Sequence, residues 1–289
     1  METGRIIKII SNQYTIQTPQ RTVIAIPRGK LRREEKPVVG DIADFEEVEG
    51  SFRLDKVHPR KNRMVRPSVA NVDQALIVQS LKDPDFSSHL LNRLMFLADL
   101  AGITPAICLT KSDALEPEEL AKLKEIISWY EKAGYDVVYT HPGSDNDALR
   151  KLLEGKVTVL CGQTGAGKSS LLNRLDPTFQ LHTQEISKAL GRGRHTTRHC
   201  ELHPVADGLV ADTPGFSSLD FTRLDVEHLD QKIRDFQPYL GQCRFADCRH
   251  LKEPGCAIKD AVEKHELSPF IYEDYRQIME EYLNAKKRY

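Results

Sequence analysis

The sequence lacks any long apolar segment. No run approaches the roughly eighteen to twenty residues of a membrane-spanning helix, and the N-terminus does not have the apolar core of a signal peptide. A transmembrane or secreted class is therefore not expected. We expect a cytoplasmic protein with no membrane partner.

The chain also lacks an overall excess of charge, since its 289 residues include 41 basic and 42 acidic ones. The molecule as a whole is thus no polycation. In residues 1–67, however, lysines and arginines outnumber the acidic residues. This local excess suits a polyanionic partner such as RNA, and a solvated charged surface is the alternative.

Hydrophobic patterning divides the chain into three parts, which its length also favours. Residues 1–62 contain short runs in which apolar and polar residues alternate, separated by Gly, Asn and Pro, and this pattern predicts a five-stranded all-β barrel. An OB-fold fits this length and commonly binds oligonucleotides, while an SH3-like barrel is the alternative. Residues 58–68 combine charge and proline with little periodicity, so we expect a linker there.

Residues 68–218 alternate strand-like and helix-like segments, which predicts a parallel α/β domain. In the first helical segment, leucines 90, 94 and 97 and Ala101 recur at helical spacing before Gly102. Strands are expected at 72–80, 104–113, 135–140, 156–162, 200–205 and 208–215, and helices at 88–102, 116–134, 145–155 and from residue 168. Residues 219–289 are predicted to be helical, interrupted by a cysteine cluster.

A glycine-rich sequence between a buried strand and an amphipathic helix matches the phosphate-binding P-loop pattern G-x-x-x-x-G-K-[ST]. Its backbone N–H groups would surround the phosphates, Lys168 would reach the β- and γ-phosphates, and Ser169 would bind Mg²⁺. The alternative is a glycine-rich turn that binds nothing. The candidate nucleotide-binding residues are Gly162, Gln163, Thr164, Gly165, Ala166, Gly167, Lys168, Ser169 and Ser170.

The sequence Asp212-Thr213-Pro214-Gly215 follows another strand. Asp212 is placed to hold magnesium through water, and the N–H of Gly215 is placed to contact the γ-phosphate. An ordinary turn would have the same composition. The P-loop beside it favours the nucleotide-binding interpretation.

The motif Thr110-Lys111-Ser112-Asp113 lies at the end of a predicted parallel strand, where α/β sheets bind ligands. An Asp113 carboxylate would accept hydrogen bonds from N1–H and the exocyclic amine of guanine, whereas adenine has an acceptor at N1. The aliphatic part of Lys111 would lie along the base. The motif therefore predicts GTP rather than ATP, although the same residues could simply cap the next helix.

The order of these motifs is unusual, because guanine recognition precedes phosphate binding along the chain. Joining neighbouring ends of a nucleotide-binding domain and opening the chain elsewhere would preserve the sheet and permute the motifs. This order, with the barrel before it and the cysteine cluster after it, resembles the RsgA (YjeQ) family of circularly permuted GTPases. The resemblance covers essentially the whole chain and includes the sequences TKSD, GQTGAGKSS, GRGRHTTR and DTPGF.

The resemblance assigns further roles to the GRGRHTTR segment. It implies that Thr197 completes the magnesium coordination and that His195 takes part in hydrolysis. Many small GTPases have a water-positioning glutamine where this chain has the apolar Phe216, so another residue must orient the water. We expect His195, Lys168 and Thr197 to be catalytic, with a surface histidine as the alternative for His195. The loop after residue 140 is left unassigned.

Three cysteines and one histidine form the last candidate site. Cys243, Cys248, His250 and Cys256 would give zinc a closed tetrahedral site with no position left for chemistry. Their spacing differs from paired C-x-x-C motifs, so three free thiols near a histidine remain the alternative. The family resemblance implies zinc at these four positions.

The resemblance also implies the activity and the partner. We expect a monomeric GTPase that converts GTP to GDP with Mg²⁺, is stimulated by the small (30S) ribosomal subunit and assists its late maturation as a conformational switch. The barrel would contact 16S rRNA through backbone charge and stacking. The alternative is a GTP-gated module that binds another RNA. Asp113 argues against the interpretation as an ATP-dependent P-loop kinase.

Overall fold

The computed structural model describes residues 1–29, 36–64, 68–177, 200–212 and 221–286, without the side chains of Asp212 and Arg223. These residues form two compact units. One consists of residues 1–76, 145–161 and 167–216, and the other of residues 77–144, 162–166 and 217–289. In the described part of the chain, no helix is both long enough and apolar enough to cross a bilayer.

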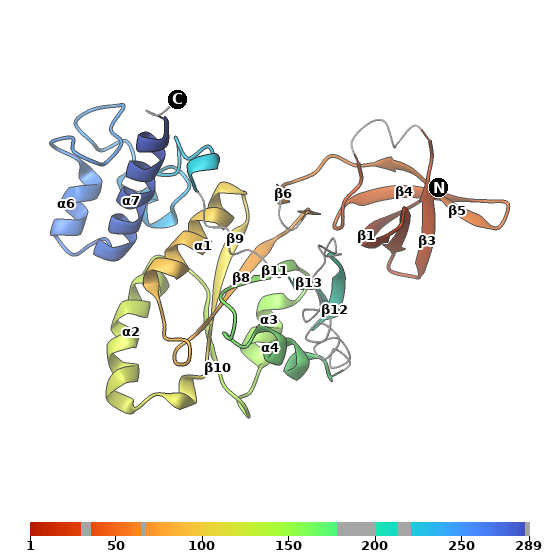
Figure 1. Ribbon diagram of the computed structural model, residues 1–289, viewed down its shortest axis with the longest axis horizontal. Coiled ribbons are helices and arrows are strands. Elements are labelled where there is room, and N and C mark those ends of the chain that lie inside the picture. Colours follow the sequence, from red (N-terminus) through yellow and green to blue (C-terminus); the bar gives the residue numbers. More distant parts are fainter. Residues whose placement is uncertain (30–35, 65–67, 178–199, 213–220, 287–289) are drawn as a thin grey trace. The chain divides into compact units, whose positions relative to one another are not determined.

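The N-terminal strands close into a barrel in the order β1-β2-β3-β5-β4 (Figure 1). β1 pairs with β4 in antiparallel register, while β3 and β5 run parallel. Alternating side chains point inward, so that Ile6, Ile16, Phe45 and Leu54 are completely buried. The predicted OB-fold barrel is confirmed. Its strands are Glu2–Ile10, Gln13–Gln17, Thr22–Pro27, Ile42–Val48 and Ser51–Val57.

The segment predicted as a linker contains regular structure. β6 (Arg63–Met64) pairs with β7 (Val69–Ala70). Just before β6, the Arg60 guanidinium contacts both oxygens of the completely buried Asp41 at 2.6 and 2.9 Å. Two-residue strands are too short to produce periodicity, which is why the sequence did not indicate them.

Six strands form the central sheet in the order β10-β9-β8-β11-β13-β12. β9 and β10 are parallel, as are β11 and β13, whereas β12 is antiparallel to β13. β8 and β11 are buried along their whole length, as expected for strands covered on both faces. The strands are β8 Gln74–Ser80, β9 Thr104–Thr110, β10 Val137–Thr140, β11 Val157–Cys161, β12 Leu202–Val205 and β13 Gly208–Asp212.

The predicted helices of this region are present, and local signals mark their ends. The Ser87 side chain caps α1 (Ser88–Leu100) by accepting a hydrogen bond from the Leu90 N–H. A capping box of Glu116 and Glu119 starts α2 (Pro117–Lys132). The other two helices are α3 Asp147–Leu153 and α4 Lys168–Leu175.

The C-terminal module is less helical than its sequence predicted. Two short 3₁₀ helices, η3 Phe221–Arg223 and η4 Arg234–Tyr239, precede α6 (Ala257–Glu263) and α7 (Pro269–Lys286). Most residues between η4 and α6 lie in turns and bends around the cysteines. α7 packs on α1, where the Asn92 amide donates to Asp274 Oδ2 at 2.6 Å and accepts from the Tyr130 hydroxyl at 2.8 Å.

Candidate nucleotide site and metal centre

The predicted P-loop has the backbone shape that its glycines allow. Gly162 has φ +131°, and a Cβ atom there would lie 2.0 Å from the carbonyl oxygen of Val78, so only glycine fits. Gly165 and Gly167 also have positive φ angles, and Gly167 caps α4. α4 therefore begins at Lys168, and the N–H groups in the first turn of a helix can bind an anion.

Side-chain exposure in the loop varies along its length. Thr164, Ser169 and Ser170 are exposed, Lys168 is half-buried, and Ala166 is completely buried. Exposed hydroxyls in the first turn of α4 are available to a metal ion or a phosphate. The roles predicted for these residues remain predictions.

Thr110 links the guanine motif to the P-loop. Its buried hydroxyl donates to the carbonyl oxygen of Ala166 at 2.7 Å and lies 3.3 Å from that of Gln79. The sequence placed Thr110 among the nucleotide-binding residues but did not indicate this contact. Its hydroxyl fixes the spacing between the end of β9 and the phosphate loop.

The rest of the guanine motif follows in a turn of 3₁₀ helix over Ser112–Ala114. The Lys111 ammonium donates to the carbonyl oxygen of Asp83, which holds its aliphatic stem in the loop after β8. The Asp113 side chain is exposed, and within the described residues its carboxylate makes no hydrogen bond. It is available to a donor such as the guanine edge.

The loop left unassigned by the sequence lies beside this motif. Thr140 pairs with Thr110 in parallel register, so the turn after β10 emerges at the same edge of the sheet. Ser144 closes the turn, because its hydroxyl donates to the carbonyl oxygen of His141 at 2.8 Å. An ordered turn next to Asp113 is a candidate for a further base contact.

The remaining predicted residues are only partly described. Asp212 ends β13 and pairs in register with Leu160, which places its backbone beside the end of β11. His195, Thr197 and Gly215 lie outside the described residues. Their proposed roles therefore rest on the sequence alone.

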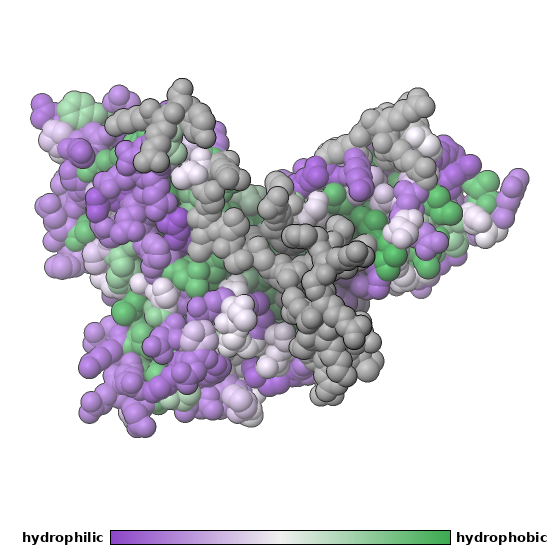
Figure 2. Space-filling view, viewed as in Figure 1, coloured by the Kyte–Doolittle hydropathy of each residue, from purple (hydrophilic) through white to green (hydrophobic). Residues whose placement is uncertain are grey.

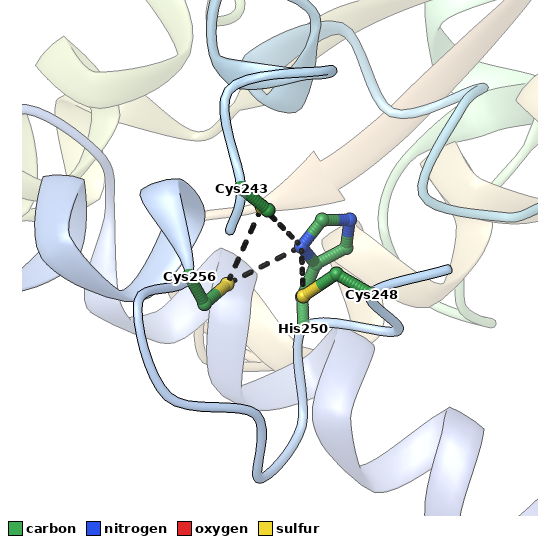
Figure 3. A group of neighbouring side chains, drawn as sticks. All are labelled: Cys243, Cys248, His250 and Cys256. Atoms are coloured by element: carbon green, nitrogen blue, oxygen red, sulfur yellow. Dashed lines mark hydrogen bonds between the residues drawn. The ribbon is translucent and has the colours of Figure 1, made fainter. Parts of the chain in front are cut away.

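Cys243, Cys248, His250 and Cys256 converge in the C-terminal module (Figure 3). Their ligand atoms all lie within 4.8 Å of one another, and His250 Nδ1 is 3.5, 3.5 and 3.3 Å from the three sulfurs. A tetrahedral zinc site with normal bond lengths has ligand separations of about 3.5–3.8 Å. The cluster therefore fits zinc in both chemistry and size.

The surrounding residues orient His250. Asp230 Oδ2 lies 3.5 Å from its Nε2, so the nitrogen that faces away from the sulfurs has a carboxylate partner. The Tyr272 hydroxyl donates to the His250 carbonyl oxygen at 2.9 Å. Burial is the largest influence on the pKa of the Cys256 thiol and raises it. The hydrogen bond with His250, the backbone hydrogen bond from Lys259 and the charge of His250 together outweigh burial, so the pKa is lowered. The sequence did not indicate Asp230, because no spacing rule connects it to the cysteines.

Comparison with known proteins agrees with this geometry. Residues 57–222 match the family described as RsgA GTPase, and residues 3–51 match the RsgA N-terminal domain. Two proteins named small ribosomal subunit biogenesis GTPase RsgA, from Shouchella clausii and Staphylococcus epidermidis, are 44% and 41% identical, each match covering 100% of both chains.

Two solved structures share the fold. YloQ, described as a circularly permuted GTPase, has a TM-score of 0.85 and 37% identity, and the match covers 100% of this chain and 97% of YloQ. YjeQ from Thermotoga maritima has a TM-score of 0.85 and 31% identity, and that match covers 97% and 98% of the two chains.

Proposed function

Because the chain belongs to the RsgA GTPase family, we propose that this GTP-hydrolysing enzyme acts in biogenesis of the small ribosomal subunit. The full-length similarity to relatives that carry this name is the observation that supports the proposal. The proposed partner is the 30S subunit with its 16S rRNA, and the proposed mode is a switch that the subunit stimulates. The proposed domains are residues 1–62, 68–218 and 219–289.

In the proposed nucleotide site, one chain segment recognises the base and another binds the phosphates. Asp113 accepts hydrogen bonds from the guanine edge, and residues 162–170 surround the phosphates with N–H groups and the Lys168 ammonium. The buried hydroxyl of Thr110 supports this assignment, since it joins the two segments directly. His195 orients the attacking water, and Thr197 and Gly215 respond to the γ-phosphate.

The family implies Mg²⁺ with GTP or GDP, and the cysteine cluster is compatible with Zn²⁺. Mg²⁺ would be held by Ser169 and Thr197, and through water by Asp212, and would supply positive charge against the phosphates. Zinc would bind the four ligands of the cluster and serve structure rather than chemistry, because all four positions are filled by protein.

The test is GTP turnover by the full-length chain with and without purified small ribosomal subunits, over a salt series. Strong stimulation is expected, and it should weaken as salt rises because contacts to rRNA release counterions. The matched control replaces small subunits with large ones. Equal turnover in all three conditions would contradict the proposal and favour a GTP-gated protein with another RNA target.

The switch is tested separately by measuring affinity for small subunits with GDP and with a non-hydrolysable GTP analogue. Tighter binding with the analogue is expected, since only differential affinity for the two states can drive a change. Equal affinities would contradict the switch and leave the GTPase assignment intact.

A further inference from the structure

A cavity of about 410 Å³ adjoins the cysteine cluster in the C-terminal module, and its volume includes the space that a bound zinc would occupy. Its size falls within the range of about 300–1,000 Å³ for small-molecule sites. The nucleotide site uses none of the residues around it. The lining residues are Asp230, Gln231, Gln237, Leu240, Gly241, Cys243, Phe245, Ala246, Cys248 and His250.

Phe245 supplies an exposed aromatic ring to this cavity. It is 41% exposed and is the one exposed aromatic among the large hydrophobic side chains of the described residues. The surface around it is polar. On the face shown in Figure 2, this module is mostly hydrophilic with isolated hydrophobic side chains. A single exposed ring in polar surroundings suits stacking on a flat ligand rather than burial against an aliphatic partner.

The charged groups indicate which part of a ligand enters the cavity. Asp230 carries a carboxylate at the cavity wall, so a phosphate would be repelled from the interior. Arg244 is exposed, and its guanidinium lies over one face of the Phe245 ring, 5.5 Å from the centroid, which leaves the opposite face for a flat ligand. A ligand with a neutral flat part and an attached anionic backbone would satisfy both groups.

The cavity also offers hydrogen bonds at its wall. The Gln237 amide N–H groups donate to the carbonyl oxygens of Gln231 and Ile233 at 2.6 and 3.5 Å, which leaves its side-chain oxygen as an acceptor. Asp230 provides further acceptor capacity, and Gln231 provides an amide with both donors and an acceptor. Every nucleobase presents N–H donors and nitrogen or oxygen acceptors at its edges.

From this combination of ring, cavity, acceptors and flanking arginine, we propose that the cavity beside the cysteine cluster binds one unpaired nucleobase of RNA. The base stacks on Phe245, and its backbone phosphate pairs with Arg244. For the identity of the natural RNA, this inference rests on the proposed ribosomal function. The binding chemistry itself does not depend on it.

The cluster positions the ring. Phe245 lies between Cys243 and Cys248 in sequence, and its carbonyl oxygen accepts from the Cys248 N–H at 3.3 Å. The Arg244 N–H donates to the carbonyl oxygen of Gly255, next to Cys256, at 2.9 Å. Ordering of this loop therefore depends on the four ligands, and base binding is expected to fall when the metal is removed.

The test measures binding of fluorescein-labelled oligoadenylate, oligouridylate and oligocytidylate to the full-length chain by anisotropy, over a salt series. Phe245→Leu should weaken binding about ten-fold, the size expected for loss of one stacked base, without changing the salt slope. Phe245→Tyr should bind like the wild type. Arg244→Gln should lower the salt slope by about one phosphate contact.

The matched control is Leu224→Ala, because Leu224 is an exposed apolar residue of the same module with a similar exposure of 39% and does not line the cavity. Bound zinc and circular dichroism are measured for each variant to confirm folding. Thiouridine-substituted oligouridylate locates the site by photo-crosslinking, and the crosslink is expected on the peptide that contains Phe245.

Three results would overturn the inference. These are oligonucleotide affinity unchanged in Phe245→Leu, no oligonucleotide binding by the wild type, and crosslinks confined to other peptides. If Phe245→Leu weakened binding to small subunits while its peptide crosslinked a ribosomal protein, the cavity would be a protein-docking site, which also overturns it. Oligonucleotide binding at the cavity without affinity for small subunits would instead remove only the proposed ribosomal function.

Discussion

Among single residues, Thr110 links the guanine motif to the phosphate loop through its buried hydroxyl. The sequence predicted a strand over residues 104–113, whereas β9 ends at Thr110 and Asp113 follows in a 3₁₀ turn. It could not indicate that the hydroxyl points to Ala166, because that contact joins positions fifty-six residues apart. A pattern within one segment predicts which residue types are present, whereas the partner of a buried hydroxyl depends on how distant strands are arranged.

Thr110→Val tests the role of this hydroxyl. The change keeps the shape and leaves the Ala166 carbonyl oxygen without its donor, which should lower the free energy of unfolding by about 1–2 kcal/mol. GTP affinity should also fall, because the spacing between the base and phosphate segments loosens. Urea unfolding and nucleotide titration measure the two effects. Thr110→Ser keeps the donor and serves as the control, and a valine variant equal to wild type in both assays would refute the role.

Among the elements, α1 shows that hydrophobic periodicity predicts the bounds of a helix better than it predicts which residues are buried. Its bounds were predicted to within two residues, and Leu94 is buried as its spacing indicated. Leu90, Leu97 and Ala101 are only half-buried, whereas the polar Asn92 is completely buried. The reason is that α7 covers a second face of α1 and supplies Asp274 as a partner for Asn92. Amphipathic spacing describes one contact face, and a helix covered on two faces does not follow it.

The C-terminal end of α1 contains a carboxylate whose environment opposes its charge. Asp99 Oδ2 is buried and has no hydrogen-bond partner in the described residues. Burial raises the pKa of Asp99 to about 8; attraction to Arg234 opposes the shift and repulsion from Asp235 adds to it. The folded chain therefore holds a proton that the unfolded chain releases near pH 4, so stability falls as pH rises from about 4 to about 8.

Asp99→Asn should remove this pH dependence. At about pH 8 the variant should exceed the wild type by at least about 1 kcal/mol, the value of one pKa unit, and at about pH 5 it should show no advantage. Urea unfolding at a series of pH values measures the difference. Asp136→Asn, at an exposed position between α2 and β10, is the control. Parallel curves for Asp99→Asn and wild type would contradict the prediction.

At the scale of the whole molecule, the permuted order of motifs was predictable because each motif has its own local spacing. The sheet order confirms that strands from both halves of the chain hydrogen-bond into one sheet. The C-terminal module was harder to predict from sequence. In the fully described stretch 240–255 only His250 is buried, so no hydrophobic pattern exists from which to predict its fold. There the four ligands take the place of a core.

Loss of the metal should therefore destabilise the folded chain. Cys248→Ser, or treatment with a zinc chelator, is expected to lower the free energy of unfolding by more than about 2 kcal/mol, because metal binding and folding of the module are linked. Calorimetry and colorimetric release of zinc measure stability and metal content. Cys200→Ser, outside the cluster, should retain both. A Cys248→Ser chain with wild-type stability and no zinc would show that the metal has no structural role.

The packing of α7 on α1 has a consequence for how the protein is made. α7 comprises eighteen residues that are synthesised long after α1, yet Asp274 within it completes the partners of Asn92. Until α7 has been synthesised, the Asn92 amide N–H groups donate to water and not to Asp274. The barrel can fold as soon as it emerges, whereas the packing around α1 is completed only after α7 has been synthesised.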